Sequence, residues 1–272
     1  YPSNHSLFVL TGTFYNPGPY SGYIAAILPV ALHRMLVLNG KKDLLLVVQY
    51  YLSLCVLILI CCVLPAGMSR AAWIASLVSC GYVVLRLYRE KIKSFVLRHR
   101  YALLGVLIVG TLFATGMYFI KRDSVDGRLL IWKITTQAIA DSPWGVEGGK
   151  TFSAFYGDVQ ERYFTDCKYS DSEAWVAGTP DFAFNEYLQI AVEYGVWGSV
   201  LFVTVLLMLL KIAGNCKHLA GMGGCLVSLM VFACFSYPIH IPAIVSIWSL
   251  VVIVLCGEGL VMMKYRLIPK IV

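Results

Sequence analysis

The feature that most constrains the fold of this chain is a series of apolar runs, each about 20 residues long, which is the length a helix needs to cross a bilayer core. Hydrophobic residues make up 59% of its 272 residues, and charged residues only 14%. We therefore exclude a soluble domain and predict an all-α fold, a polytopic integral membrane helix bundle. We expect about seven spans, at residues 22–38, 44–64, 71–87, 101–120, 186–211, 219–238 and 244–263.

The distribution of Lys and Arg predicts the orientation of these spans, because short loops rich in basic residues tend to stay cytoplasmic. Residues 86–100 hold six Lys or Arg against one Glu. Residues 39–43, residues 264–270 and the pair Lys211 and Lys217 are basic too, and with seven spans all four segments fall on one side. The net charge of +7 therefore reflects the membrane topology and indicates no nucleic-acid partner.

The long segment 121–184 falls on the opposite, outer side, between the fourth and fifth predicted spans. It carries seven Lys or Arg and ten Asp or Glu. Its first part reads as a helix capped near Ser124 or Asp126 and stopped by Pro143 and Gly145. The remainder is polar and aromatic without a clear period, so we expect a loop of short helical turns.

We treat residues 1–272 as a single membrane domain into which this outer loop is inserted. The same topology puts residue 1 outside, yet no signal peptide precedes the first span. The expectation is that further helices lie upstream. Cys167 is the one cysteine in the outer loop, and no Cys or His spacing suggests a disulfide framework or a metal site.

Residues 179–210, "TPDFAFNEYLQIAVEYGVWGSVLFVTVLLMLL", begin as a polar helix start and continue as an apolar span. We expect Thr179 to cap this helix, with Pro180 at its first helical position. Four polar residues lie together at helical spacing and form what we name the polar stripe: Asn185, Glu186, Gln189 and Glu193. Lipid cannot satisfy such groups, so the polar stripe should face the protein interior or a wet cavity.

Two arginines are candidate anion ligands on the outer side. Arg70 opens a span in "LPAGMSRAAWIA", after Pro65 and Gly67 break the preceding one. A helix N-terminus favours anions, and a guanidinium adds a fork that matches phosphate oxygens. Arg128 begins the predicted helix of the outer loop. The alternative for each arginine is an anchoring role at the membrane interface.

Two other features have ordinary explanations. The stretch "PWGVEGGKTF", residues 143–152, is rich in glycine but lacks the spacing of a phosphate loop, so turn geometry explains its glycines. His240 lies between two prolines in an outer link. A solvated loop histidine is the default there, with catalytic use as the alternative.

Four motifs in order resemble the O-antigen ligase and O-antigen polymerase superfamily, over nearly the whole chain. They are "GTFYNPGPYSGYIAAILP" (12–29), "MSRAAWIA" (68–75), "DGRLLIWKITTQAIADSPWGVEGG" (126–149) and "FNEYLQIAVEYGVWG" (184–198). The resemblance implies about five further helices upstream, and a location in the bacterial inner membrane with the active site facing the periplasm.

The resemblance also implies an activity. Members of the superfamily transfer a glycan from an undecaprenyl-pyrophosphate carrier to an acceptor hydroxyl, and need neither a metal nor a cofactor. By this resemblance Arg70 and Arg128 match the arginines thought to hold the pyrophosphate. The acceptor would be lipid A core, another glycan or a protein. Within the polar stripe, Asn185, Gln189 and Glu193 would line the acceptor cavity.

One position departs from the ligase pattern. Ligases of the superfamily carry a His immediately before the Asn of an N-x-x-L motif, and here that position is Phe184. Glu186 is our first choice for the base that activates the acceptor, and His240 is the second. The alternative is that Asn185 and Glu186 only cap and orient the helix. The missing histidine slightly favours a polymerase or a divergent ligase.

A different functional class is a lipid-linked-glycan flippase or another polytopic transporter. Transporters are often built from inverted repeats with paired broken helices, and the sequence shows neither. A purely structural membrane subunit is disfavoured by the large polar outer loop.

Overall fold

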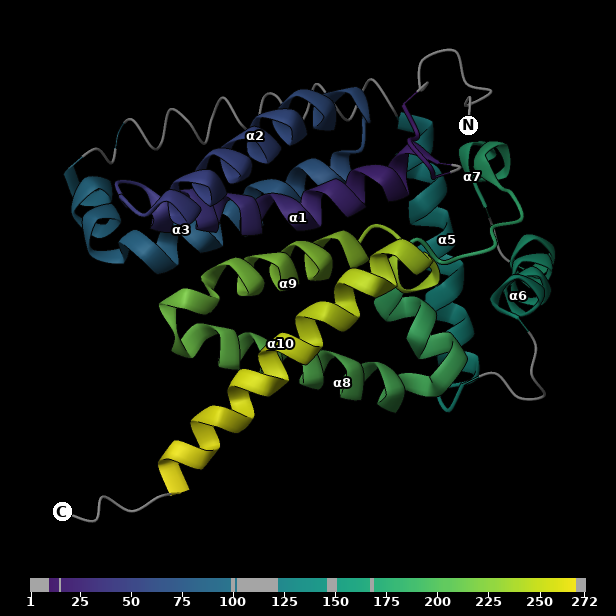
Figure 1. Ribbon diagram of the computed structural model, residues 1–272. Coiled ribbons are helices and arrows are strands. Elements are labelled where there is room, and N and C mark those ends of the chain that lie inside the picture. Colours follow the sequence, from purple (N-terminus) through teal and green to yellow (C-terminus); the bar gives the residue numbers. More distant parts are fainter. Residues whose placement is uncertain are drawn as a thin grey trace. The chain divides into compact units, whose positions relative to one another are not determined.

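The computed structural model describes residues 10–14, 16–98, 101, 122–145, 151–166 and 169–267, and in these ranges the regular elements are all helices. Nine α-helices are described in this part of the chain (Figure 1): α1 (Pro17–Leu38), α2 (Leu44–Ala66), α3 (Arg70–Arg98), α5 (Arg122–Asp141), α6 (Phe152–Asp166), α7 (Asp171–Val176), α8 (Glu186–Asn215), α9 (Ala220–Ala233) and α10 (Pro242–Leu267). The predicted all-α membrane fold is confirmed.

Five of the described helices are long and apolar enough to cross a membrane, namely α1, α2, α3, α8 and α10. They correspond to five of the predicted spans. The predicted span 219–238 is shorter than expected, because α9 has 14 residues and a helix of that length is only about 21 Å long. The predicted span 101–120 lies outside the described residues, apart from Tyr101.

The helix boundaries follow from capping side chains. Asn16 accepts a hydrogen bond from the Gly18 backbone N–H at 2.9 Å, and Pro17 takes the first position of α1. Asp43 caps α2 in the same way. The predicted break near Pro65 is confirmed, since α2 ends at Ala66 and α3 begins at Arg70.

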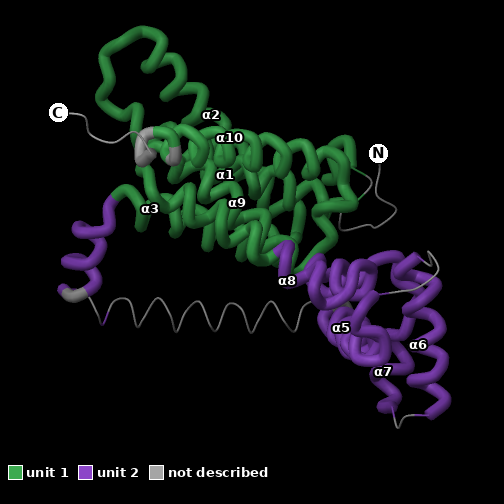
Figure 2. The backbone as a smooth tube through the Cα atoms, turned by 90° about the horizontal axis from the view of Figure 1, so that it is seen from below, with its two compact units in different colours: residues 1–87, 203–272 green, residues 88–202 purple. Residues whose placement is uncertain are grey.

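The chain divides into two compact units, which are described separately. The first comprises residues 1–87 and 203–272, and the second residues 88–202 (Figure 2). In the first unit, α1 packs against α2, α9 and α10. Its core consists of small and aliphatic residues, and Ala25, Ala26 and Leu226 have no exposed surface.

In the second unit, α5 packs against α6 and α7. Their shared core contains Leu130 and Ile134 of α5, Tyr156 and Tyr163 of α6, and Ala183 from the segment before α8. The predicted helix of the outer loop is confirmed as α5, although it begins at Arg122, before the expected cap. The expectation of only short helical turns beyond it is wrong in one place, because α6 has 15 residues.

Helix α8 begins later than its opening sequence predicts. Residues 177–185 are not helical, and the first helical residue is Glu186. Thr179 and Pro180 are therefore not the start of the helix. Helix α8 is also kinked at Gly195, which has a φ of 77° and a ψ of 170°.

Candidate active site

The start of α8 is determined by Asn185. Its side-chain Oδ1 accepts hydrogen bonds from the backbone N–H groups of Tyr187 at 3.1 Å and Leu188 at 3.2 Å. These are two of the N–H groups that a helix start leaves without an intrahelical partner. Asn185 is the cap that we had expected at Thr179, and this capping accounts for one of the polar residues in the stripe.

Gln189 connects the polar stripe to the segment before the helix. Its Oε1 accepts a hydrogen bond from the Ala183 backbone N–H at 2.7 Å, and its Nε2 donates to Glu193 Oε1 at 2.5 Å. Gln189 is only 1% exposed. The prediction that the polar stripe faces the protein interior is consistent with this network of buried hydrogen bonds.

Glu186 is the most enclosed member of the polar stripe. It is the first residue of α8, where a carboxylate is favoured by the helix dipole, and it has no exposed surface. Ionisable groups with no exposed surface are uncommon in proteins. An acceptor hydroxyl could reach this carboxylate only by displacing the groups that now cover it.

Helix α5 binds the segment Ala183–Asn185 with two side chains one turn apart. The indole Nε1–H of Trp132 donates to the Ala183 carbonyl at 3.0 Å. The guanidinium carbon of Arg128 lies 5.2 Å from the centre of the Phe184 ring, which is cation–π distance. Of the predicted site residues, Arg128 is therefore brought to Phe184, which lies two residues before Glu186, the first residue of α8.

A backbone contact fixes α5 against α8 at the other end. The Val196 backbone N–H donates to the Pro143 carbonyl at 2.9 Å. Gly145, with φ of 99°, and Gly195, with φ of 77°, meet at this junction. A Cβ at Gly195 would lie 2.7 Å from the carbonyl carbon and oxygen of Trp144. The turn role predicted for Gly145 is confirmed; residues 146–150 of the same motif lie outside the described residues.

The other two predicted site residues belong to the first unit. Arg70 is the first residue of α3 and is partly exposed. Just before it, Ser69 Oγ accepts from the Ala72 backbone N–H at 3.4 Å. His240 ends the short 3-10 helix Pro238–His240 and is exposed. The polar stripe and Arg128 belong to the second unit, so Arg70 and His240 are described separately from them.

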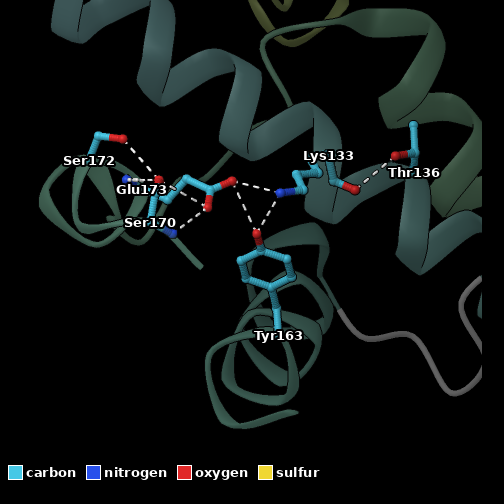
Figure 3. A network of polar contacts seen from close by, with 6 residues as sticks. All are labelled: Lys133, Thr136, Tyr163, Ser170, Ser172 and Glu173. Carbon is cyan, nitrogen blue, oxygen red and sulfur yellow. Dashed lines mark hydrogen bonds and ion pairs between the residues drawn. The ribbon is translucent and has the colours of Figure 1, made fainter. Parts of the chain in front are cut away.

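A polar network joins the three helices α5, α6 and α7 (Figure 3). Lys133 Nζ lies 2.7 Å from Glu173 Oε1 and donates to the Tyr163 hydroxyl at 2.6 Å. The hydrogen bond from Lys133 holds the pKa of Glu173 at about 2, below its ordinary 4.5. The same pair raises the pKa of Lys133. Ser170 and Glu173 complete the network by capping α7 reciprocally.

Sequence reasoning missed the roles of Trp132 and Phe184. Arg128 and Trp132 are four residues apart in a predicted helix, and this spacing places them on one face. That signal was present in the sequence. The segment on which the two side chains act lies about 50 residues further along the chain, and no local pattern connects them.

Comparison with known proteins gives the family. A family model described as O-Antigen ligase matches residues 55–203. This chain belongs to the O-antigen ligase family. The match confirms the resemblance seen in the motifs. The matched residues include Arg70, Arg128 and the polar stripe, whereas His240 lies outside them.

A search of curated proteins found a distant relative. The chain is 27% identical over 177 residues to the protein of Rickettsia bellii (strain RML369-C) named "Putative polysaccharide ligase". The aligned residues make up 63% of this chain and 40% of the relative. The chain therefore spans less than half of the length of this relative.

Proposed function

We propose that this member of the O-antigen ligase family transfers a glycan from an undecaprenyl-pyrophosphate carrier to an acceptor hydroxyl, at the periplasmic face of the bacterial inner membrane. The observation that carries this proposal is the contact of Arg128 with Phe184, which lies two residues before Glu186, the first residue of α8. It brings a fixed cation and a buried carboxylate to one helix terminus.

Arg128 would hold the pyrophosphate of the donor. The guanidinium presents a planar fork of N–H donors that fits two phosphate oxygens, and the start of α8 adds the positive end of a helix dipole. Arg70, which begins α3, is the second proposed pyrophosphate ligand, on the same chemical grounds. Neutralising charge on the leaving pyrophosphate would lower the barrier to its departure.

The proposed reaction is a direct displacement. The acceptor oxygen bonds to the anomeric carbon of the glycan, the bond from that carbon to the pyrophosphate oxygen breaks, and undecaprenyl pyrophosphate leaves with the electron pair. The hydroxyl proton passes to Glu186, which lies at the end of the polar stripe. Because Glu186 is fully buried, the acceptor must open the start of α8 to meet it. His240, exposed in the other unit, is the second candidate for the base.

We favour ligation over polymerisation as the overall reaction, because both the family description and the name of the relative refer to ligases. The proposed acceptor is the hydroxyl of lipid A core, with a glycan or a protein as alternatives. Asn185, Gln189 and Glu193 would then line the acceptor side of the site. Gln189 holds the Ala183 backbone N–H before α8, and Glu193 in turn accepts a hydrogen bond from Gln189.

The test uses the full-length protein in lipid nanodiscs with purified undecaprenyl-pyrophosphate glycan and candidate acceptors. Arg70→Ala and Arg128→Ala should each remove most activity, and Lys should rescue poorly because it lacks the bidentate fork. Glu186→Gln should lower turnover by roughly 10²-fold, within the range of general base catalysis. Addition of a metal chelator should leave the wild-type rate unchanged.

Each outcome separates one role from another. An active Glu186→Gln protein together with an inactive His240→Ala protein would move the base to the last outer link. Normal turnover in both would mean that donor electrostatics and positioning suffice. Normal turnover in both arginine variants would leave the arginines as membrane anchors and remove the basis of the proposal.

The periplasmic orientation has its own test. A cysteine placed at Gly178, which is exposed and would meet no neighbouring atom, should react with an impermeant thiol reagent in whole cells. Cys167 is replaced by Ser in this background so that the label reports the new site. Ser94→Cys, on the exposed end of α3, should stay unlabelled until the cells are opened. The opposite pattern would reverse the orientation.

A further inference from the structure

We infer that Phe184 is a positioning residue, whose ring holds the Arg128 guanidinium in place for the pyrophosphate of the donor. The inference rests on the proposed function for the identity of the anion, and on the structure for the contact. Three independent observations lead to it: the backbone conformation of Phe184, the way its neighbours are held, and the place of its ring.

The first observation is backbone strain. Phe184 has a φ of 51°, a left-handed conformation, and Met68 is the only other non-glycine residue with positive φ in the described part of the chain. This conformation is a genuine outlier for a bulky side chain and persists only where the surroundings enforce it. Glycine would adopt this conformation without steric cost. The aromatic ring at this position therefore needs a physical reason.

The second observation is that both neighbours of Phe184 are held. The Ala183 N–H donates to Gln189 and its carbonyl accepts from Trp132, so the peptide groups before Phe184 are tied to α8 and α5. On the other side, Asn185 caps α8 through two hydrogen bonds. These contacts hold the backbone of Phe184 in the strained conformation and aim its ring.

The third observation is where the ring lies. Ala183 and Leu188 on either side belong to the core of the second unit or pack against it, but Phe184 is in neither group and is only half-buried. Its ring instead lies under the Arg128 guanidinium at 5.2 Å. Filling the core is therefore not what the strained ring does. The ring does contact the cation.

A guanidinium lying face to face on the ring at this cation–π distance would explain the benefit. A ring attracts the face of the planar group, whereas the N–H donors that bind phosphate oxygens point outward from its edge. Stacking therefore restricts the rotation of a long side chain without using these donors. Trp132, one turn along α5, ties the same helix to the same segment. An anion then meets a guanidinium that is already oriented, which lowers the entropy lost on binding.

The test measures binding of undecaprenyl pyrophosphate, without glycan, to the full-length protein in nanodiscs. Phe184→Leu keeps the bulk but removes the aromatic face, and it should weaken binding by about 2- to 12-fold, the range expected for ordering one long side chain on binding. Phe184→Tyr keeps the face and should bind within about twofold of wild type. Phe164→Leu, an aromatic residue packed against the core of the same unit, is the matched control and should not change binding.

A double-mutant cycle distinguishes positioning from general loss of structure. If Phe184 acts through Arg128, Phe184→Leu should have no further effect once Arg128 is replaced by Ala. Additive losses would overturn the inference. Phe184→Gly relieves the strained φ, so it should melt no lower than Phe184→Leu and yet bind as weakly; wild-type binding by the glycine variant would also overturn it.

The same experiment separates this inference from the proposed function. If Arg128→Ala binds the probe weakly and Phe184→Leu binds it normally, the anion site stands and the positioning role fails. If Arg128→Ala binds as tightly as wild type, Arg128 is not a pyrophosphate ligand, and the proposed function loses the observation that carries it.

Discussion

Two regions of the molecule use glycine for close packing in different ways. In the first unit, the two nearest neighbours of Gly224 in α9 are side chains: an added Cβ would lie 2.6 Å from Val83 Cγ2 and 2.8 Å from Pro29 Cβ, with the Ser79 carbonyl oxygen further away at 3.3 Å. In the second unit, Gly195 of α8 faces backbone: an added Cβ would lie 2.7 Å from both atoms of the Trp144 carbonyl. Both glycines let segments approach more closely than any other residue would allow.

The difference lies in what can move. Side chains such as those of Val83 and Pro29 can shift by a few tenths of an ångström together with their helices. A carbonyl group cannot shift without moving the chain on either side, and Gly195 and its partner Gly145 also have positive φ. Packing between the apolar helices therefore has some tolerance, whereas the α5–α8 junction has almost none. That junction fixes the helix that carries Arg128 against the helix that carries the polar stripe.

The largest effect is expected at the junction. Gly195→Ala combines a backbone clash with a φ and ψ that are essentially restricted to glycine, so it should destabilise the protein by about 3 kcal/mol or more. Thermal unfolding of the detergent-solubilised protein measures this. The matched control is Gly157→Ala in α6, where a Cβ would meet no atom within 4 Å, and alanine should melt at the same temperature or higher.

Transfer activity sharpens this first comparison. The Gly195 variant should lose activity even in the fraction that remains folded, because the start of α8 shifts relative to Arg128. An alanine at Gly195 that leaves both melting and activity at wild-type values would mean that the junction does not fix the site.

An intermediate effect is expected in the first unit. Gly224→Ala should cost about 1–3 kcal/mol, the usual range for over-packing by one methyl group. Gly81→Ala in α3, where a Cβ would meet nothing within 4 Å, is its control. Measured side by side, the melting temperature should be lowest for Gly195→Ala, higher for Gly224→Ala and highest for Gly81→Ala. If the Gly224 variant were the least stable of the three, the distinction between side-chain and backbone neighbours would not hold.

Local patterns in the sequence predicted the long apolar helices well, of which α3 and α8 extend from one unit into the other. Apolar runs of sufficient length gave the five long helices, and a proline and a glycine marked the break before Arg70. These features depend on neighbouring residues only. The predicted span 219–238 is shortened to α9. A 3-10 helix, Lys217–Leu219, directly precedes α9, and the α-helix ends at Ala233, before the 3-10 helix Pro238–His240.

The errors in the second unit have identifiable physical causes. "TPDF" is a good helix start by itself, but Gln189 and Trp132 hold the backbone of Ala183 outside the helix, and Asn185 supplies the cap. Helix α6 buries Phe152, Tyr156, Val159 and Tyr163. Their spacing is helical, but the polar and charged residues between them obscure it in the sequence.

The features of the candidate site also separate into those that follow from local sequence and those that depend on distant residues. The expectation that the polar stripe needs partners followed from its chemistry; Glu186 and Gln189 are buried, whereas Asn185 and Glu193 are half-buried. The cation–π contact between Arg128 and Phe184 and the meeting of Gly145 with Gly195 are non-local. Each joins residues about 50 positions apart, so no periodicity in a single segment indicates them.

The smallest effect is expected at the ion pair between Lys133 and Glu173, which is a contact between side chains. Lys133 and Glu173 connect α5 to α7 and line an open cleft of about 370 Å³, and Lys133 is 50% exposed. Solvent screens such a pair, so its contribution to stability should be at most about 1 kcal/mol. The pKa of Glu173 is lowered to about 2 from 4.5, so the folded state binds its proton less readily than the unfolded state. The contribution is therefore present above pH 4.5 and disappears as the pH falls towards 2.

Other carboxylates titrate in this range, so the measurement is the difference in melting temperature between wild type and Glu173→Gln. That difference should be about 2–4 °C or less at pH 7 and should shrink towards zero as the pH is lowered from 4.5. A difference that stayed constant with pH would assign the effect to the shape of the side chain, and the side-chain network would then contribute through packing, as the glycine contacts do.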